Sequence, residues 1–299
     1  MTASHDSRAT SEVATGGLVF LLITSVGWGL NWPIMKYVLR EWPPLSTRGT
    51  TGVVGSLLLL AIALVIGQNL RVPREQWGRL VMFAAFNVSA WMALMGLALL
   101  WLPASEGAVI AYTMPVLASL LAWPVLGERL TLLRTVALLL GIGGIAALMG
   151  GNGIAASMEK LPGILLALTG AFLFALGTVL GKRFPLKLPV ITSAAWQIMI
   201  GCLPVAVLGL VLEHPKVSAL SSTGWALMCY LVVVQFCVAY VSWFAALRRL
   251  PASIAAIGTL LVPVIGVVAS AVMLGEPLGL GQITALAMTV GGVALATRS

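Results

Sequence analysis

Long apolar runs alternate along the chain with short breaks that are rich in charge, proline and glycine. Each run holds about 20 residues, the length that an α-helix needs to cross the hydrocarbon layer of a membrane. Such runs lie at 17–37, 45–67, 77–100, 103–126, 131–150, 162–182, 189–212, 222–247, 251–274 and 279–297. The pattern predicts an all-α integral membrane protein with ten transmembrane helices.

The breaks also predict how the chain is divided. Residues 1–16 are polar and are expected to form a cytosolic N-terminal tail. The first run is longer than the apolar core of a signal peptide, so we expect it to be retained. The runs fall into two sets of five, at 17–150 and 162–297, which a polar and glycine-rich linker at 151–161 joins.

The composition excludes a soluble domain. Apolar residues make up 60% of the 299 residues and charged residues only 9%, whereas a soluble domain has about 25% charged residues. The net charge of +8 comes from basic residues scattered between the apolar runs. That spacing fits loops beside anionic lipid headgroups rather than a nucleic-acid groove, so membrane lipids are expected partners and nucleic acid is not.

The basic residues also predict the orientation. With a cytosolic N-terminus, the inner loops and ends hold twelve of the 17 Lys and Arg residues. Cytoplasmic loops carry the excess of positive charge in membrane proteins. Both termini are therefore expected in the cytosol, in a multi-pass protein of a bacterial inner membrane.

The two sets of runs show an internal repeat. The Leu-Pro-Ala-Ser segment at 102–105 recurs at 250–253, a shift of 148 residues, and the same shift pairs the Leu-Gly-Glu segments at 126–128 and 274–276. It also places Asn87 opposite Gln235. Because each copy has five predicted helices, an odd number, the copies are expected to cross the membrane in opposite directions. Inverted repeats of this kind place a substrate site where the repeats meet.

These residues carry a family resemblance. The Trp-Gly-Leu-Asn segment at 28–31, Arg48 early in the second predicted helix and the doubled Gly-Glu motif resemble the EamA-type transporters of the drug/metabolite transporter superfamily. Within it the chain is similar to the YddG-type branch of bacterial amino-acid exporters. The resemblance implies a secondary transporter that exports neutral or aromatic amino acids by alternating access. The second copy departs from the motif with Pro277, where the first has Arg129.

Polar and aromatic residues within the runs are candidates for the substrate pathway. Asn87, Trp91 and Met95 are spaced by four and would share one helix face, and Gln235 and Ser242 would share another. The Asn87 and Gln235 amides are expected to face one another and to bind a zwitterion, since an amide both donates and accepts. The alternative is that these amides only join helices.

Further pathway candidates come from the other predicted helices. An aromatic cavity with few fixed charges would select apolar or aromatic small molecules. The alternative for each residue is plain packing, and Trp32 and Trp101 are predicted to be anchors at the membrane interface. The further candidates are Trp28, Asn31, Tyr112, Trp196, Gln197, Tyr240 and Trp243.

Prolines within the predicted helices, and charges near their ends, are candidates for a role in gating. Pro115 and Pro263 fall in the middle of the predicted helices at 103–126 and 251–274. Like Pro33, each of them removes a backbone hydrogen bond, so the three prolines are predicted hinges, or else fixed kinks. Lys36 and Lys182 are predicted at opposite mouths, where they bind substrate or extend to headgroups. Glu128 and Glu276 are expected to bind the N-terminal amides of the helix that follows each of them.

No motif indicates an energy source or a cofactor. There is no phosphate-binding loop of the GxxxxGK[ST] type, and neither a metal nor a cofactor is expected. Glu106 is the carboxylate that reaches furthest into a run, so facilitated transport is favoured over proton coupling. The alternative function is a multidrug or lipid-like exporter; an intramembrane enzyme would need clustered catalytic groups that the sequence lacks. A duplicated chain supplies both halves of its pathway, which predicts a functional monomer.

Overall fold

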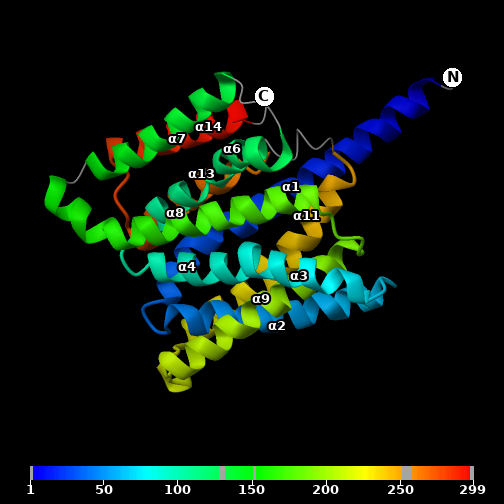
Figure 1. Cartoon of the computed structure of the whole chain (residues 1–299), viewed down its shortest axis with the longest axis horizontal. Helices are drawn as coiled ribbons and strands as arrows, with labels where there is room; N and C mark the ends of the chain where they lie inside the picture. The colour runs from blue at the N-terminus through cyan, green and yellow to red at the C-terminus, as the bar shows by residue number, and fades with distance from the viewer. Residues whose placement is uncertain (1–2, 128–131, 151–152, 251–257, 297–299) are drawn as a thin grey trace.

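The computed structural model describes residues 3–127, 132–150, 153–250 and 258–296, and every regular element within these ranges is a helix (Figure 1). The first half contains α1 (Ala3–Val38), α2 (Pro44–Val65), η1 (Arg74–Gln76), α3 (Trp77–Phe83), η2 (Ala84–Ala90), α4 (Trp91–Ala98), α5 (Ala104–Ala111), α6 (Met114–Leu126) and α7 (Leu132–Gly150). The second half contains α8 (Gly153–Arg183), α9 (Val190–Leu212), η3 (Val217–Ala219), α10 (Ser222–Tyr230), η4 (Leu231–Val238), α11 (Ala239–Leu247), α13 (Leu261–Leu274) and α14 (Leu280–Ala296).

Seven helical spans in the described part of the chain are long and apolar enough to cross a membrane. They are Thr15–Val38, Pro44–Val65, Arg74–Ala98, Ala104–Leu126, Met158–Arg183, Val190–Leu212 and Ser222–Leu247. The other three predicted runs contain α7, α13 and α14, and the predicted start at 251–257 lies outside the described residues. The chain is thus a multi-pass membrane protein, and the number of ten spans stays a prediction.

Two helices extend beyond the predicted boundaries. α1 begins at Ala3, so it also takes in most of the predicted tail, and it projects from the bundle at the N-terminus (Figure 1). α8 begins at Gly153 and covers most of the predicted linker. The span predicted as one helix at 103–126 is interrupted between α5 and α6, at Tyr112 and Thr113.

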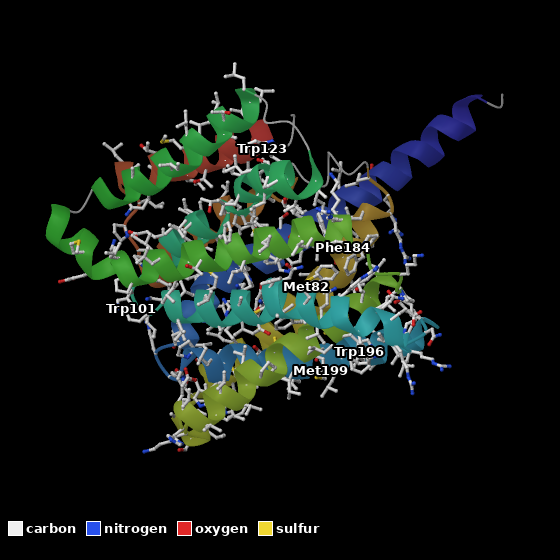
Figure 2. The ribbon with its side chains drawn as sticks, viewed as in Figure 1. Met82, Trp101, Trp123, Phe184, Trp196 and Met199 are labelled. Carbon is white, nitrogen blue, oxygen red and sulfur yellow. The ribbon has the colours of Figure 1, made fainter. Side chains whose placement is uncertain are left out.

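The outside of the bundle is apolar. Val65 is 86% exposed, Leu280 84% and Val272 80%. In water this surface would cost about 25 cal/mol per Å², whereas lipid chains solvate it. Trp101 and Trp123 also lie on the outside (Figure 2). Trp101 is 43% exposed, and its role as an interfacial anchor stays a prediction. Trp32 is only 4% exposed, so its predicted role as an interfacial anchor is wrong.

The packing of the helices repeats between the two halves. α2 packs along α9 on one flank and α7 along α14 on the opposite flank (Figure 1). Between them, α1 packs on α13 and α11, while α8 packs on α6 and α4. Exchanging each helix for its equivalent in the other half converts one pair of contacts into the other. The packing therefore has the two-fold pattern that a duplicated chain predicts.

The contact between α2 and α9 depends on small residues. A Cβ atom on Gly49 would overlap the backbone of Ala206, and one on Gly209 would overlap the backbone of Ser46. A Cβ on Gly52 would overlap the Sγ atom of Cys202. Small residues allow helix backbones to approach closely in membranes, where the hydrophobic effect does not drive helices together.

Two π-helical segments occupy equivalent positions in the halves. η2 interrupts the third span and contains Asn87, and η4 interrupts the span of α10 and α11 and contains Gln235. π-turns are rare and are frequent at functional sites. The two amides that the repeat pairs therefore both sit on irregular helix turns.

Candidate functional site

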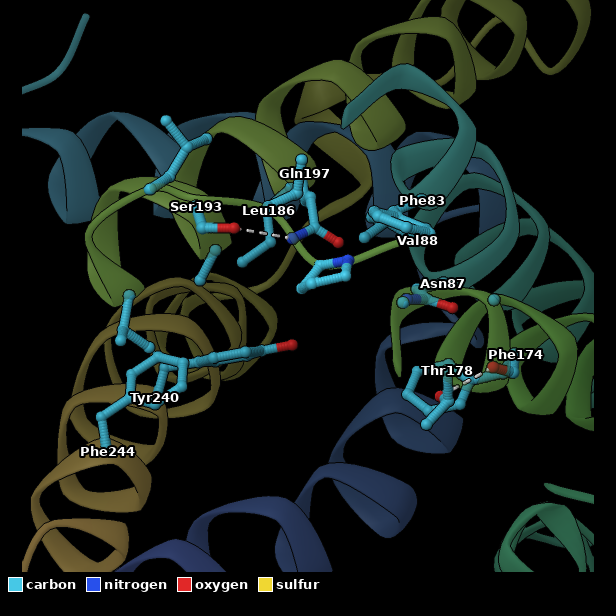
Figure 3. A pocket seen from close by; sticks show the side chains of 17 residues that line it. Phe83, Asn87, Val88, Phe174, Thr178, Leu186, Ser193, Gln197, Tyr240 and Phe244 are labelled. Carbon is cyan, nitrogen blue, oxygen red and sulfur yellow. Dashed lines mark hydrogen bonds between the residues drawn. The ribbon is translucent and has the colours of Figure 1, made fainter. Parts of the chain in front are cut away.

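A cavity of about 450 Å³ lies between the third span, α8, α9 and α11 (Figure 3). Its polar lining residues come from four different elements and are Asn87, Thr178, Ser193, Gln197 and Tyr240. Its aromatic lining residues are Phe83, Phe174, Tyr240 and Phe244. A mostly apolar cavity of this size with a few polar groups is typical of a small-molecule site.

The polar groups of the cavity differ in what they can offer a ligand. Thr178 donates its hydroxyl to the Phe174 carbonyl oxygen (2.9 Å), and Gln197 donates its amide to the Ser193 hydroxyl (3.1 Å). The Oδ1 atom of Asn87 is buried and has no hydrogen-bond partner among the residues that the structure describes. Figure 3 shows the Tyr240 hydroxyl projecting into the space that Asn87 and Gln197 also face. Asn87, Gln197 and Tyr240 are thus the polar side chains that line this space from three sides.

The opposite end of the bundle is held together by carboxylates at helix starts. Glu213, which follows α9, accepts hydrogen bonds from the Leu45 and Ser46 amides (3.0 and 2.7 Å) and from the Ser46 hydroxyl (2.7 Å). Glu276 likewise accepts from the Ala104 and Ser105 amides, at 2.7 and 2.9 Å. Charge-assisted bonds to the positive end of a helix dipole are among the stronger polar contacts.

Glu276 corrects one expectation. It was predicted to bind the start of the helix that follows it, whereas it binds the start of α5 in the other half. The Glu276 carboxylate sits beyond the C-terminus of α13, which packs against α5, so these amides are nearer than those of α14. The equivalent Glu128 lies outside the described residues.

Two lysines also join helices at the end of the bundle where Glu213 and Glu276 bind helix starts. Lys36 donates to the carbonyl oxygens of Leu99 and of Leu102, the latter at 2.8 Å, just beyond the end of α4. Lys160 forms an ion pair of 2.6 Å with Glu106, which is 2% exposed. Lys36 is therefore engaged with helix-end carbonyls, and Glu106 already has a basic partner.

The direction of α9 separates the cavity from this closed end. Val190, Ser193 and Gln197 line the cavity from the start of α9, and Glu213 follows its last residue. Lys182 is exposed at the end of α8, next to the cavity residue Gly181. The cavity thus lies toward the end of the bundle where α8 passes into α9.

An aromatic cluster extends from the cavity to α1. The Trp28 ring lies 5.4 Å from that of Tyr240 and 5.9 Å from that of Trp243. Its indole nitrogen donates to the Gln235 carbonyl oxygen at 3.4 Å. Trp28 and Trp243 are therefore neighbours of the cavity rather than part of its wall.

Several predicted pathway residues lie away from the cavity. Met95 and Tyr112 are buried in the apolar core, and Gln235 and Ser242 are also buried but do not line the cavity. The prediction of one continuous stripe assumed a regular α-helix, and the π-turns shift which residues share a face. The two amides consequently do not both face the cavity.

The tryptophans on the third span and on α9 have other partners. The Trp91 ring lies 5.0 Å from that of Phe174. Trp196 stacks edge-on against Trp77 at 5.9 Å and donates its indole hydrogen to the Leu70 carbonyl oxygen at 3.0 Å. Trp196 therefore holds the 66–73 loop, on the side of α9 away from the cavity.

The three predicted hinge prolines have different settings. Pro33 lies within the continuous α1. Pro115 is the second residue of α6 and Pro263 the third residue of α13, each just after a two-residue break. The expectation that Pro115 and Pro263 lie in mid-helix is wrong, because these prolines stand at helix starts, where no intrahelical bond is lost.

Sequence reasoning missed the setting of Arg48. This side chain is 3% exposed, and its Nη1 atom donates to Asn31 Oδ1 at 3.3 Å. Its Nε atom is buried without a hydrogen-bond partner. The available signal in the sequence was an arginine within an apolar run.

The described part of the chain shows no cluster of side chains that could bind a metal ion. No group of three or more His, Cys, Asp or Glu side chains is close enough to hold an ion, in the parts of the chain that the structure describes. Apolar spans around a mostly apolar cavity with a few polar groups define a multi-pass membrane protein with a small-molecule cavity inside its bundle.

The chain belongs to the EamA-like transporter family, whose model matches residues 15–150 and again 161–298. It is 32% identical to "Uncharacterized transporter YvbV" of Bacillus subtilis (strain 168), over 93% of this chain and 89% of that protein. It is 28% identical to "Probable amino-acid metabolite efflux pump" of Salmonella typhimurium, over 93% of both chains. A crystal structure with 23% sequence identity matches with a TM-score of 0.67, covering 96% of this chain and 97% of that one; this likeness concerns the fold alone.

Proposed function

We propose that this family member is a secondary transporter that exports neutral or aromatic amino acids, or related small metabolites, from the cytosol across a bacterial inner membrane. It resembles the YddG-type exporters in this respect. The observation that carries the proposal is the cavity, in which amide and phenol groups stand beside phenyl rings. A zwitterion needs hydrogen-bond donors and acceptors for its charged groups, and its side chain needs apolar surface.

The mechanism we propose is alternating access between two inverted five-helix repeats in a functional monomer. The cavity lies at one end of the bundle while carboxylates, Lys36 and the Glu106–Lys160 pair close the other. With cytosolic termini, this arrangement is the inward-facing state. Glu106 has a basic partner at 2.6 Å, which supports uncoupled transport over proton coupling, and the transporter family to which the chain belongs disfavours an enzyme.

The orientation predicts the labelling of two matched turns. Gly127 and Gly275 are both exposed and end α6 and α13 at φ values of 74° and 68°, so a cysteine would be similarly strained at each. In a background with Cys229→Ser, we expect a membrane-impermeant maleimide to label Gly275→Cys in intact cells and Gly127→Cys only after the inner membrane is opened. Labelling of both from one side would overturn the inverted repeat.

Counterflow in proteoliposomes tests the function. We expect liposomes that contain the purified protein and unlabelled phenylalanine or tryptophan to accumulate the labelled amino acid saturably, with or without a pH gradient. Protein-free liposomes are the control. Absence of counterflow across a panel of neutral amino acids, with transport of cationic dyes instead, would favour the multidrug alternative.

A further inference from the structure

The core of the bundle contains a cation that has no counter-ion in the part of the chain that the structure describes. Arg48 is in the second turn of α2 and only 3% exposed. No carboxylate lies against it among the described residues, and its one hydrogen bond runs from Nη1 to the neutral Asn31 amide. Burying an unpaired charge costs several kcal/mol in proteins. Charged groups at such positions in membrane proteins usually serve substrate binding or transport.

The unused part of this guanidinium has a defined geometry. The side-on edge of an arginine presents Nε and Nη2 as two parallel donors, which match the two oxygens of a carboxylate. Here Nη1 is held by Asn31 on α1, and Nε is buried without a partner. The bond to Asn31 therefore orients the guanidinium through Nη1 and does not use the edge formed by Nε and Nη2.

Arg48 lies just beyond the inner wall of the cavity. The Sγ atom of Cys202 on α9 packs against Gly52, one turn along α2 from Arg48. Ile198, which lines the cavity, precedes Cys202 by one turn of α9, or about 6 Å along the helix. On the third span, Gly96 packs closely against the aliphatic stem of Arg48, because a Cβ atom there would lie 3.2 Å from the Arg48 Cγ atom. From Ile198, the way to Arg48 therefore leads one turn along α9 to Cys202 and one turn back along α2 from Gly52.

We propose that Arg48, oriented by Asn31, is the carboxylate subsite of the transport pathway. The inference rests on the proposed function and narrows it: the substrates carry a carboxylate, and analogues without one are discriminated against. The phenyl and phenol groups of the cavity then hold the substrate side chain.

Calorimetric titration of the detergent-purified protein with phenylalanine and phenylalaninamide tests the subsite. Wild-type protein should bind phenylalanine at least about tenfold more tightly, because a charge-assisted bidentate contact is worth more than a neutral one. Arg48→Gln should abolish this preference while the affinity for the amide is kept. Arg40→Gln, at an exposed arginine beside Tyr37, is the matched control and should keep the preference.

The outcomes separate the two proposals. If wild-type protein binds both ligands equally but shows counterflow, the carboxylate subsite is wrong and the transporter stands. If it neither binds nor transports any amino acid, both proposals fail. If Arg48→Gln weakens both ligands alike, or keeps the preference, Arg48 is structural and the subsite is overturned.

A measurement on unmutated Arg48 covers the case in which Arg48→Gln does not fold. Cys202 is buried against Gly52, one turn of α2 from Arg48, and its alkylation by N-ethylmaleimide can be followed by peptide mass spectrometry. Phenylalanine should slow this alkylation at least about threefold, whereas phenylalaninamide at equal concentration should not. Equal protection by both ligands, or by neither, would contradict the proposal.

Discussion

Gly49→Leu should separate α2 from α9 and destabilise the protein more than any other single change considered. A Cβ atom at Gly49 would already overlap the backbone nitrogen and Cα of Ala206, and backbone cannot rotate away as a side chain can. Overpacking of this kind costs roughly 1–3 kcal/mol or more. We expect the melting temperature in detergent, followed by tryptophan fluorescence, to fall by roughly 5–10 °C.

Gly78→Leu is the matched control for this prediction. Gly78 is an exposed helical glycine, and a Cβ atom there would meet nothing within 4 Å. The same change of residue type should leave the melting temperature unchanged or raise it slightly, because leucine favours helix over glycine. Equal melting temperatures for the two variants would show that the close contact between α2 and α9 contributes little to stability.

Asn87→Leu should have the largest effect on transport among the cavity residues. The Asn87 amide lies on the π-turn of the third span and has no hydrogen-bond partner at Oδ1, so a substrate ammonium can use it. A hydrogen bond to a charged group contributes about 1.5–3 kcal/mol, which corresponds to a loss of roughly 10- to 100-fold. Initial rates of amino-acid counterflow, normalised to reconstituted protein, measure this loss.

Thr178→Val controls for a change of polarity in the same cavity. The Thr178 hydroxyl is already donated to the Phe174 carbonyl oxygen, so it has little to offer a ligand, and valine keeps its shape. We expect its counterflow rate to stay within about twofold of wild type, consistent with the small worth of an intrahelical hydroxyl bond. If both variants transported alike, Asn87 would belong to the helix packing and not to the site.

The membrane architecture could be predicted from the sequence because the length and spacing of apolar runs follow from the thickness of the bilayer. The pairing of Asn87 with Gln235 through the repeat also followed from sequence, and both lie on π-turns. The π-turns themselves could not be predicted, since their backbone hydrogen bonds depend on packing. That is why Met95, placed on the Asn87 face by regular spacing, lies in the core instead.

The polar contacts between distant segments were beyond sequence reasoning. Glu276 is close in sequence to α14 but binds the start of α5, because the order of helices in space differs from their order in the chain. The buried setting of Arg48 depends on three helices that enclose it from separate parts of the sequence. The sequence shows only that Arg48 is a basic residue within an apolar run. Its burial away from any carboxylate of the described residues results from tertiary packing.

The pairing of Glu106 with Lys160 has an electrical consequence. The two opposite charges are 2.6 Å apart, so any displacement of the pair moves no net charge through the membrane field. One elementary charge crossing the full field is worth about 2.3 kcal/mol per 100 mV, and a zwitterionic cargo adds none. Transport would then be electroneutral, and a cell that holds more substrate than its surroundings would release it at any membrane potential.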